Sequence, residues 1–224
     1  MHLSAGDSNK GPVRFTPETW IVRDFFDLPW PFEDGFFDFS LCMGTLEDIR
    51  DPIVIAKEIQ RISKAEYISM PTRATESFPW IVNRHKMEDG LVGYFHHRWC
   101  VEIIDDALVF KAKCPLLYNN DKLIIREIGQ HTLNFFWHSE FPVGEEYFGS
   151  VIEAEKDCVG FKKKHEAYLR SIKKGEFQVD LYNYWDTRLG EKPDFTPYYD
   201  FRSSRVDYYS ARLKHKILKV IGRV

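Results

Sequence analysis

The neighbouring histidines His96 and His97, followed by Arg98, are the residues whose types point most directly to chemistry. An imidazole titrates near neutral pH, so one of these histidines could act as a general base. Arg98 could bind a carboxylate or phosphate of a substrate through its forked guanidinium. Because neighbouring side chains of an extended segment point to opposite sides, we expect only one histidine to face a given pocket and no metal site. A polar strand edge is the alternative interpretation.

Two acidic residues, Glu47 and Asp48, form a second candidate group. Their carboxylates could contact a substrate or act as a base. Asp48 could equally pair with Arg50 or cap the helix that follows. A small-residue segment, Cys42-Met43-Gly44, comes just before them and reads as the exit from a strand. No histidine is placed by the sequence to activate Cys42, which argues against a cysteine nucleophile.

Short strands and one helix must position these residues. Apolar runs at Trp20–Val22, Phe36–Cys42 and Tyr67–Met70 predict buried strands. Between the last two, Asp51 is a good N-cap and Pro52 suits the first helical position, so we expect a helix that ends near Ser63. This order of strand, helix and strand is typical of a parallel α/β sheet. In such sheets ligands bind at the carboxyl ends of the strands.

The second half of the chain predicts an added β-rich segment and C-terminal helices. Asp105-Asp106 joins two alternating apolar runs and indicates a hairpin. The expected strands are Trp99–Ile104, Ala107–Lys113, Leu123–Glu127 and Thr132–Trp137, and the expected helices are 151–174 and 203–221 with an irregular segment at 176–201.

An ordered series of motifs runs through residues 20–77. Asp24 follows the first apolar run, and a turn at Leu28–Phe32 comes next. The turn is followed by Asp34, Phe37 and Asp38. The series continues with Leu46-Glu47-Asp48 and then with the helix residues Asp51-Pro52, Glu58, Arg61 and Lys64. This series resembles the middle of class I S-adenosylmethionine-dependent methyltransferases of the type-11 kind. Thr45–Pro52 (TLEDIRDP) and Gly93–Trp99 (GYFHHRW) resemble an uncharacterised branch of these enzymes, and the resemblance extends over roughly residues 13–145.

The resemblance implies a Rossmann-like sheet with S-adenosylmethionine as cofactor. Asp24 would accept a hydrogen bond from the adenine amino group, and the Phe25 N–H would face the ring; the alternative is that Asp24 caps a turn. Cys42, Met43 and Gly44 would run beside the methionine part of the cofactor. The acceptor would be a small or carbohydrate-like molecule. Its catalytic contacts would come from His96, His97 and Asp48, and its binding contacts from Glu47 and Arg98.

The glycine-rich loop expected of this family has no counterpart in the sequence. The family opens with a strand, a glycine loop, a helix and a second strand that ends in an acid. Residues 2–7 faintly resemble the first strand and loop but lack the second glycine, and no room is left for the helix and strand that should follow. We therefore read residues 1–18 as a loop and expect an incomplete Rossmann-like sheet that lacks its first strands. Residues 1–150 would form the methyltransferase-like α/β domain, and residues 151–224 a helical and irregular extension. A fragment, a segment supplied by another chain and a degenerate relative are the competing explanations.

Composition narrows the class of protein further. The net charge of -3 gives no indication of nucleic-acid binding. No apolar run reaches the ~20 residues of a membrane span, and there is no secretory signal. The four cysteines are far apart without zinc-finger spacing, which favours reduced thiols and a cytoplasmic location.

Two features of the predicted architecture suggest which binding partners the chain could have. An incomplete sheet exposes an unpaired edge, which favours a homodimer or a covering partner chain. The basic C-terminal stretch 202–223 could contact an anionic membrane surface, or be a solvated helix. Two functions therefore remain open: a methyltransferase, and a non-catalytic remnant of the fold that serves in binding or assembly.

Overall fold

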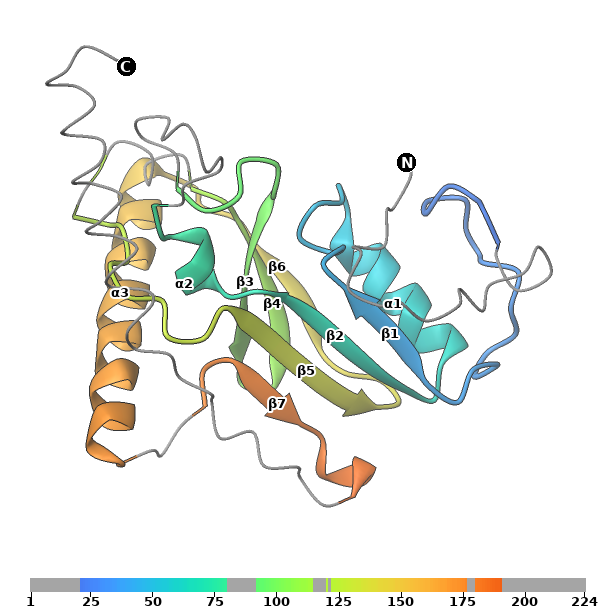
Figure 1. Cartoon of the computed structure of the whole chain (residues 1–224). Coiled ribbons are helices and arrows are strands. Elements are labelled where there is room, and N and C mark those ends of the chain that lie inside the picture. Colours follow the sequence, from blue (N-terminus) through green and yellow to red (C-terminus); the bar gives the residue numbers. More distant parts are fainter. Residues whose placement is uncertain (1–20, 80–91, 115–119, 121, 177–179, 191–224) are drawn as a thin grey trace, which may run out of the picture. The chain divides into compact units, whose positions relative to one another are not determined.

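The computed structural model describes residues 21–79, 92–114, 120, 122–176 and 180–190 (Figure 1). Contacts divide the chain into residues 1–30 and residues 31–224, and each unit is described by itself. In the first unit, the predicted strand at Trp20–Val22 is wrong for the residues that the structure describes. Ile21 and Val22 are exposed and lie outside any strand, because no neighbouring backbone pairs with them.

A parallel strand–helix–strand unit opens the second part. Strand β1 (Ser40–Met43) pairs in parallel with β2 (Ala65–Pro71), and α1 (Pro52–Ile62) connects them. The predicted helix is confirmed at both ends, because the Asp51 carboxylate accepts a bond from the Val54 N–H and the helix ends before Ser63. The predicted strand at Phe36–Cys42 begins four residues late, and Phe37 only bridges to Ser63.

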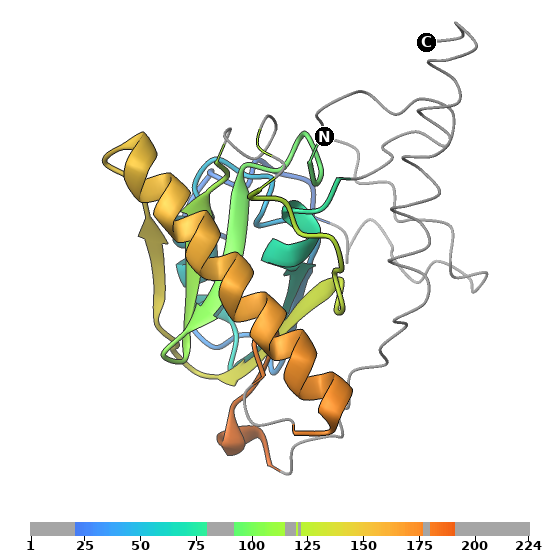
Figure 2. The same ribbon diagram turned by 90° about the vertical axis from the view of Figure 1, so that its left-hand side faces the viewer.

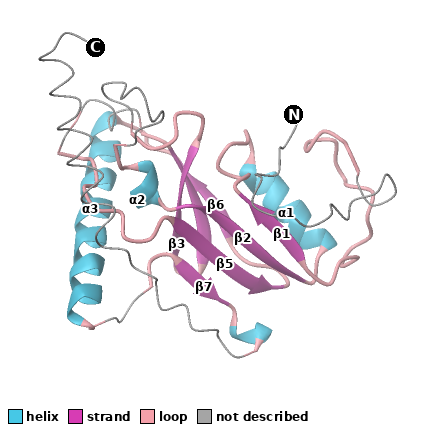
Figure 3. Ribbon diagram, in the orientation of Figure 1, coloured by secondary structure: helices cyan, strands magenta, loops and turns pink. Residues whose placement is uncertain are grey.

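The first sheet has the order β1-β2-β5-β7 among the described strands (Figure 3). Strand β5 (Thr132–His138) was predicted and runs antiparallel to β2, and β7 (Asn183–Trp185) runs parallel to β5. The sheet is therefore mixed, and β1 lies at its edge within the described part of the chain. This mixed α/β architecture confirms the predicted Rossmann-like fold class.

A second sheet has the order β3-β4-β6. It consists of the predicted hairpin, β3 (Trp99–Ile104) and β4 (Ala107–Ala112), and an unpredicted strand, β6 (Val143–Glu146). Asp105 and Asp106 both have positive φ angles, 48° and 61°, which is the conformation that a tight two-residue hairpin turn requires. The strand predicted at Leu123–Glu127 is wrong: this segment is a loop whose Leu123, Ile124 and Ile125 are buried among side chains.

Helix α3 (Val151–Lys174) packs along the second sheet, as Figure 2 shows. A buried cation fixes it there: Arg73, the first residue of the short helix α2 (Arg73–Glu76), pairs with Glu102 of β3 and Asp157 of α3. The predicted helix at 151–174 is confirmed, and the one at 203–221 lies outside the described residues. The domain boundary at residue 150 stays a prediction. None of the described helices is long and apolar enough to cross a membrane.

Candidate functional site

A cavity of about 470 Å³ lies at the carboxyl ends of β1 and β2. This is the edge at which open α/β sheets bind their ligands. Six of the residues singled out from the sequence meet there: Met43, Gly44, Glu47, Asp48, His96 and His97. The other lining residues, which the sequence did not single out, are Ser69, Met70, Pro71, Thr75, Tyr94, His131 and Thr132.

The loop after β1 forms one wall of this cavity. Gly44 has a φ angle of +57°, which a side chain disfavours, and its N–H donates to Ser69 O of β2 over 2.9 Å. The Thr45 hydroxyl donates to Met43 O over 3.1 Å, and the Asp48 N–H donates to Thr45 O over 3.2 Å. These bonds turn the chain sharply, so that Asp48 returns toward the end of β1.

A second loop, Gly93–Arg98, supplies the histidines. The Arg98 N–H donates to Glu47 O over 2.8 Å, so this loop is bonded directly to the one after β1. The Trp99 indole adds a bond to Ile49 O over 2.9 Å. The segment that carries His96 and His97 is thereby held against the segment that carries Asp48.

The expectation that only one histidine faces the cavity is wrong. His96 lies in a turn that the His97 N–H closes onto Tyr94 O over 3.3 Å, so the segment is not extended. The Nε2 atoms of His96 and His97 lie 3.9 and 3.7 Å from Asp48 Oδ1. The two imidazole rings contact each other edge to face, with centroids 4.5 Å apart. Both imidazoles therefore converge on one carboxylate oxygen.

Glu76, at the end of α2, is a member of the site that the sequence reading missed. Its buried carboxylate lies 2.7 Å from His97 Nδ1 through Oε1 and 2.7 Å from Lys113 Nζ through Oε2. An ionised carboxylate only accepts hydrogen bonds, so His97 carries its proton on Nδ1 and its Nε2 is free to bind a ligand. The position of Glu76 could have pointed to the site, because it lies five residues after the end of the parallel strand β2, at the edge where such sheets bind ligands.

Burial shapes the electrostatics of the cavity wall. Burial raises the pKa of Glu47 to about 7; the nearby carboxyls of Asp48 and Glu76 add to this, and His97 opposes it. Glu47 Oε2 is buried and has no hydrogen-bond partner among the described residues. Burial, assisted by the Glu47 charge, raises the pKa of the Cys42 thiol to about 12. The argument against a Cys42 nucleophile is therefore supported on physical grounds, because almost no thiolate is present near neutral pH.

Two predicted site residues do not line this cavity, and two others lie in the first unit. Arg98 is exposed and Cys42 half-buried, and neither lines it. Asp24 and Phe25 belong to the first unit, which is described by itself. Within that unit, Asp24 Oδ1 accepts a bond from the Phe26 N–H over 2.8 Å, which is the turn-capping role of the alternative interpretation.

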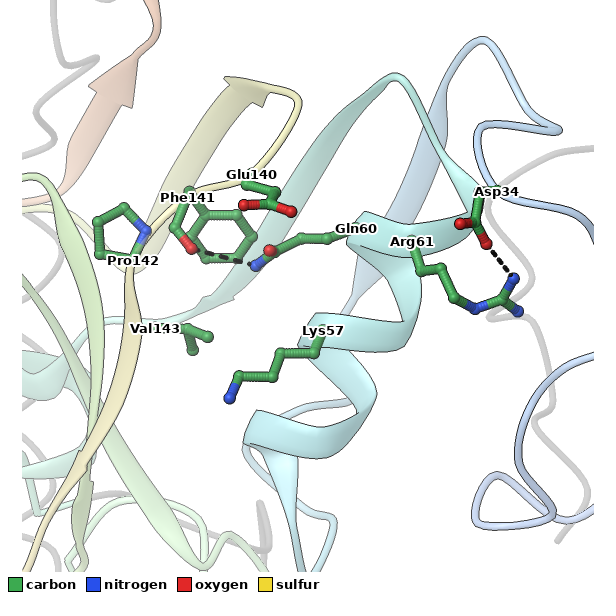
Figure 4. A pocket seen from close by; sticks show the side chains of 8 residues that line it. All are labelled: Asp34, Lys57, Gln60, Arg61, Glu140, Phe141, Pro142 and Val143. Atoms are coloured by element: carbon green, nitrogen blue, oxygen red, sulfur yellow. Dashed lines mark hydrogen bonds and ion pairs between the residues drawn. The ribbon is translucent and has the colours of Figure 1, made fainter.

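A larger hollow of about 850 Å³ lies between α1 and the residues before β6 (Figure 4). Two of its polar side chains bond to neighbouring protein groups: Arg61 donates to Asp34 over 2.8 Å, and Gln60 donates to Phe141 O over 3.3 Å. None of the candidate residues lies there. The chemistry-bearing residues thus gather in the smaller cavity, which we take as the candidate site.

Comparison with known proteins agrees with the N-terminal part of this architecture. Residues 4–66 match the family model described as a methyltransferase domain. No curated protein matches the chain, and no solved structure matches it either. The matched segment contains β1, α1 and the start of β2, together with Gly44 and Asp48 of the cavity. Residues 4–66 are therefore similar to a methyltransferase domain, which supports a class I S-adenosylmethionine-dependent methyltransferase as the family of this segment.

Proposed function

We propose that the chain transfers a methyl group from S-adenosylmethionine to a small-molecule or carbohydrate-like acceptor in the cavity at the ends of β1 and β2. One observation carries the proposal. The segment Met43-Gly44, which the resemblance assigns to the cofactor, and the cluster of Asp48, His96 and His97 line the same cavity. The methyl donor and the acceptor must lie close together and in line for methyl transfer, so a single cavity lined by both groups of residues supports this reaction.

Met43, Gly44 and Glu47 form the side of the cavity that we call the cofactor wall, and this wall has features that suit S-adenosylmethionine. When bound, this cofactor supplies a methyl group on a positively charged sulfonium and also carries an ammonium. Glu47 Oε2 is buried and has no hydrogen-bond partner in the part of the chain that the structure describes, so it suits a cationic or hydrogen-bond-donating group. A Cβ added at Gly44 would first meet Glu47 Oε1, at 3.8 Å, so the missing side chain leaves the approach to this carboxyl open. Adenine binding by Asp24 and Phe25 remains part of the proposal.

Asp48, His96 and His97 form the side of the cavity that we call the acceptor wall, which is polar and suits hydroxyl groups. Asp48, His96 and His97 offer hydrogen-bond acceptors and donors within one small area, and Tyr94 and His131 lie on the same cavity. A proton must leave an acceptor hydroxyl during methylation, and this group of side chains can receive it. We therefore assign the catalytic contacts to Asp48, His96 and His97, and a binding contact to Glu47.

Methylation assays with paired glycine variants test the proposal. A panel of hydroxylated small molecules and sugars is incubated with S-adenosylmethionine, and methylated product and S-adenosylhomocysteine are measured by mass spectrometry. Gly44→Val strains a positive φ and fills the cofactor wall, so turnover should fall about tenfold or more. Gly144→Ala is the matched control, because a Cβ there meets nothing within 4 Å. Equal turnover in both variants would contradict the cofactor assignment.

A second candidate, a non-catalytic protein that assembles through its sheet edge, is favoured by the surface of β1. Leu41 and Met43 are 68% and 59% exposed on this edge strand, and Phe36 and Phe39 nearby are also exposed. Exposed apolar edges promote pairing with another chain. Light scattering on the eluting protein should then give the mass of a dimer that Leu41→Lys converts to a monomer. A monomeric wild-type chain would refute homodimer formation.

A further inference from the structure

We propose that Asp48, His96 and His97 form a binding site for a divalent transition-metal ion of the zinc class. The three side chains each offer one ligand atom, and these atoms lie within 4.8 Å of one another. These are the residues that the proposed function assigns as catalytic contacts, but the evidence for metal binding is the geometry of these residues and their neighbours alone.

The distances within the cluster suit a shared ion better than direct hydrogen bonds. Asp48 Oδ1 lies 3.9 Å from His96 Nε2 and 3.7 Å from His97 Nε2, which is beyond hydrogen-bond range. Two ligand atoms held about 2.1 Å from one zinc ion at a tetrahedral angle lie about 3.4 Å apart. Both distances from Asp48 to the histidines are therefore within about half an ångström of coordination geometry, and all three ligand atoms lie within 4.8 Å of one another.

The buried oxygen of Asp48 is a second, independent observation. Asp48 Oδ1 is shielded from solvent and makes no hydrogen bond among the described residues. A buried carboxylate oxygen without a partner is costly, and a bound cation removes that cost. The oxygen that lacks a partner is also the one on which both imidazoles converge.

Glu76 supplies the outer contact that metal-binding histidines characteristically have. Its Oε1 lies 2.7 Å from His97 Nδ1, which places the proton on Nδ1 and leaves the Nε2 lone pair directed at the cluster. Lys113 Nζ lies 2.7 Å from the other oxygen of Glu76 and balances its charge. The orientation of His97 is therefore set by the protein before any ion binds.

The donor set selects the class of ion. Two imidazole nitrogens and one carboxylate oxygen suit zinc, cobalt, iron or manganese, whereas magnesium and calcium prefer oxygen ligands alone. Three protein ligands leave at least one coordination position open, as in catalytic rather than structural zinc sites. Because all three ligands line the cavity, water or an oxygen of a bound molecule can take that position.

Cobalt absorption spectroscopy and zinc calorimetry test the site on the full chain without a histidine tag and without S-adenosylmethionine. We expect one equivalent of Co²⁺ to give visible absorption bands that Zn²⁺ abolishes, and Mg²⁺ to compete with neither. Asp48→Asn and His96→Gln should weaken Zn²⁺ binding about tenfold or more. His96 is half exposed, so its replacement should leave the fold intact, as circular dichroism can verify.

The matched control is His131→Gln, which changes a histidine of the same cavity outside the cluster. It should keep Zn²⁺ affinity within a factor of about two. No Zn²⁺ heat with the folded wild-type chain would overturn the proposal. So would an equal loss of affinity in His131→Gln and His96→Gln, which would mean diffuse binding to surface histidines. Because the cofactor is omitted, either result leaves methyl transfer to be judged by its own assay.

Discussion

The Nδ1 atom of His97 donates to Oε1 of Glu76 over 2.7 Å, and both side chains are buried. This bond joins α2, which follows β2, to the loop that leads into β3. Lys113, beyond β4, bonds to the same carboxylate, so three separate segments fix one imidazole. The candidate site is therefore held by contacts within the protein, with His97 oriented toward Asp48.

The role of Glu76 in orienting His97 can be separated from its role in stability. Glu76→Gln should lower Co²⁺ affinity about tenfold, because the amide is a weaker acceptor for the His97 N–H. Lys113→Met is the control, since it removes the ion pair but leaves the bond to His97 in place. Both variants should unfold at a lower temperature, whereas only the first should lose metal affinity. Equal metal affinity in the two variants would contradict the orienting role.

Gly93 should be intolerant of a side chain. Its φ angle is +62°, and an added Cβ would lie 2.5 Å from the backbone oxygen of Glu76. The backbone must move to relieve this contact, so Gly93→Ala should lower the free energy of unfolding by about 1–3 kcal/mol. Urea denaturation measures this, with Gly144→Ala, which has open space around it, as the control. A Gly93→Ala variant as stable as that control would refute the described loop conformation.

Glu66 should make the fold less stable as the pH rises. This residue of β2 is fully buried, and neither carboxyl oxygen completes a hydrogen bond in the described structure. Burial raises its pKa to about 9, and the contact with Trp137 on β5 opposes the rise only in part. The unfolded chain ionises near its ordinary value of 4.5, so the stability contributed by the protonated folded form is lost as the pH rises from there toward 9.

Denaturation at several pH values measures this effect. Each pH unit within the window should reduce the free energy of unfolding by up to about 1.4 kcal/mol. Glu66→Gln keeps the size of the side chain and cannot ionise, so it should flatten the profile and be the more stable protein at pH 8. An unchanged pH slope in the variant would show that Glu66 is not the residue responsible.

The buried Arg73 should be a large single contributor to stability. Its guanidinium pairs with Glu102 and Asp157 and lies 4.6 Å from the centre of the Phe161 ring. Arg73→Met leaves the two carboxylates with Lys111 as their remaining cation, and should cost about 3–5 kcal/mol.

The partly exposed Arg61 provides the comparison. It pairs with Asp34 and Glu58 nearer the surface, and Arg61→Met should cost much less stability, because solvent screens exposed ion pairs. Thermal or urea unfolding of both variants gives the difference. Similar losses in the two would show that the contacts of Arg73 do not fix α3 against the sheet.

Local signals explain which elements could be predicted from the sequence. Asp51 and Pro52 act within the first turn of α1, and Asp105-Asp106 forms the β3–β4 turn by itself, so neighbouring residues alone determine these features. The run at Leu123–Glu127 is equally apolar, yet it is a loop. Its side chains are buried by contacts with α2 and α3, and apolar composition does not distinguish such burial from strand pairing.

The candidate site was predicted only in part, because residue types can be read from the sequence but long-range geometry cannot. Glu47, Asp48, His96 and His97 were identified by residue type, and the structure places them together. Their geometry was not predictable, because the turn that directs both imidazoles toward Asp48 depends on Gly93 and on the bond from Arg98 to Glu47 O. Glu76 is part of no recognised sequence motif, because its role depends on contacts with His97 and Lys113, which are distant in the sequence.

Calorimetric titration with S-adenosylmethionine tests the central claim most directly. We expect the folded full chain to bind one equivalent with micromolar affinity, S-adenosylhomocysteine to compete, and Asp24→Ala to weaken binding about tenfold through the lost adenine contact. Unchanged affinity in Asp24→Ala would refute the adenine assignment alone. The absence of heat at high micromolar cofactor, with circular dichroism showing a folded chain, would contradict the proposed methyltransferase function itself.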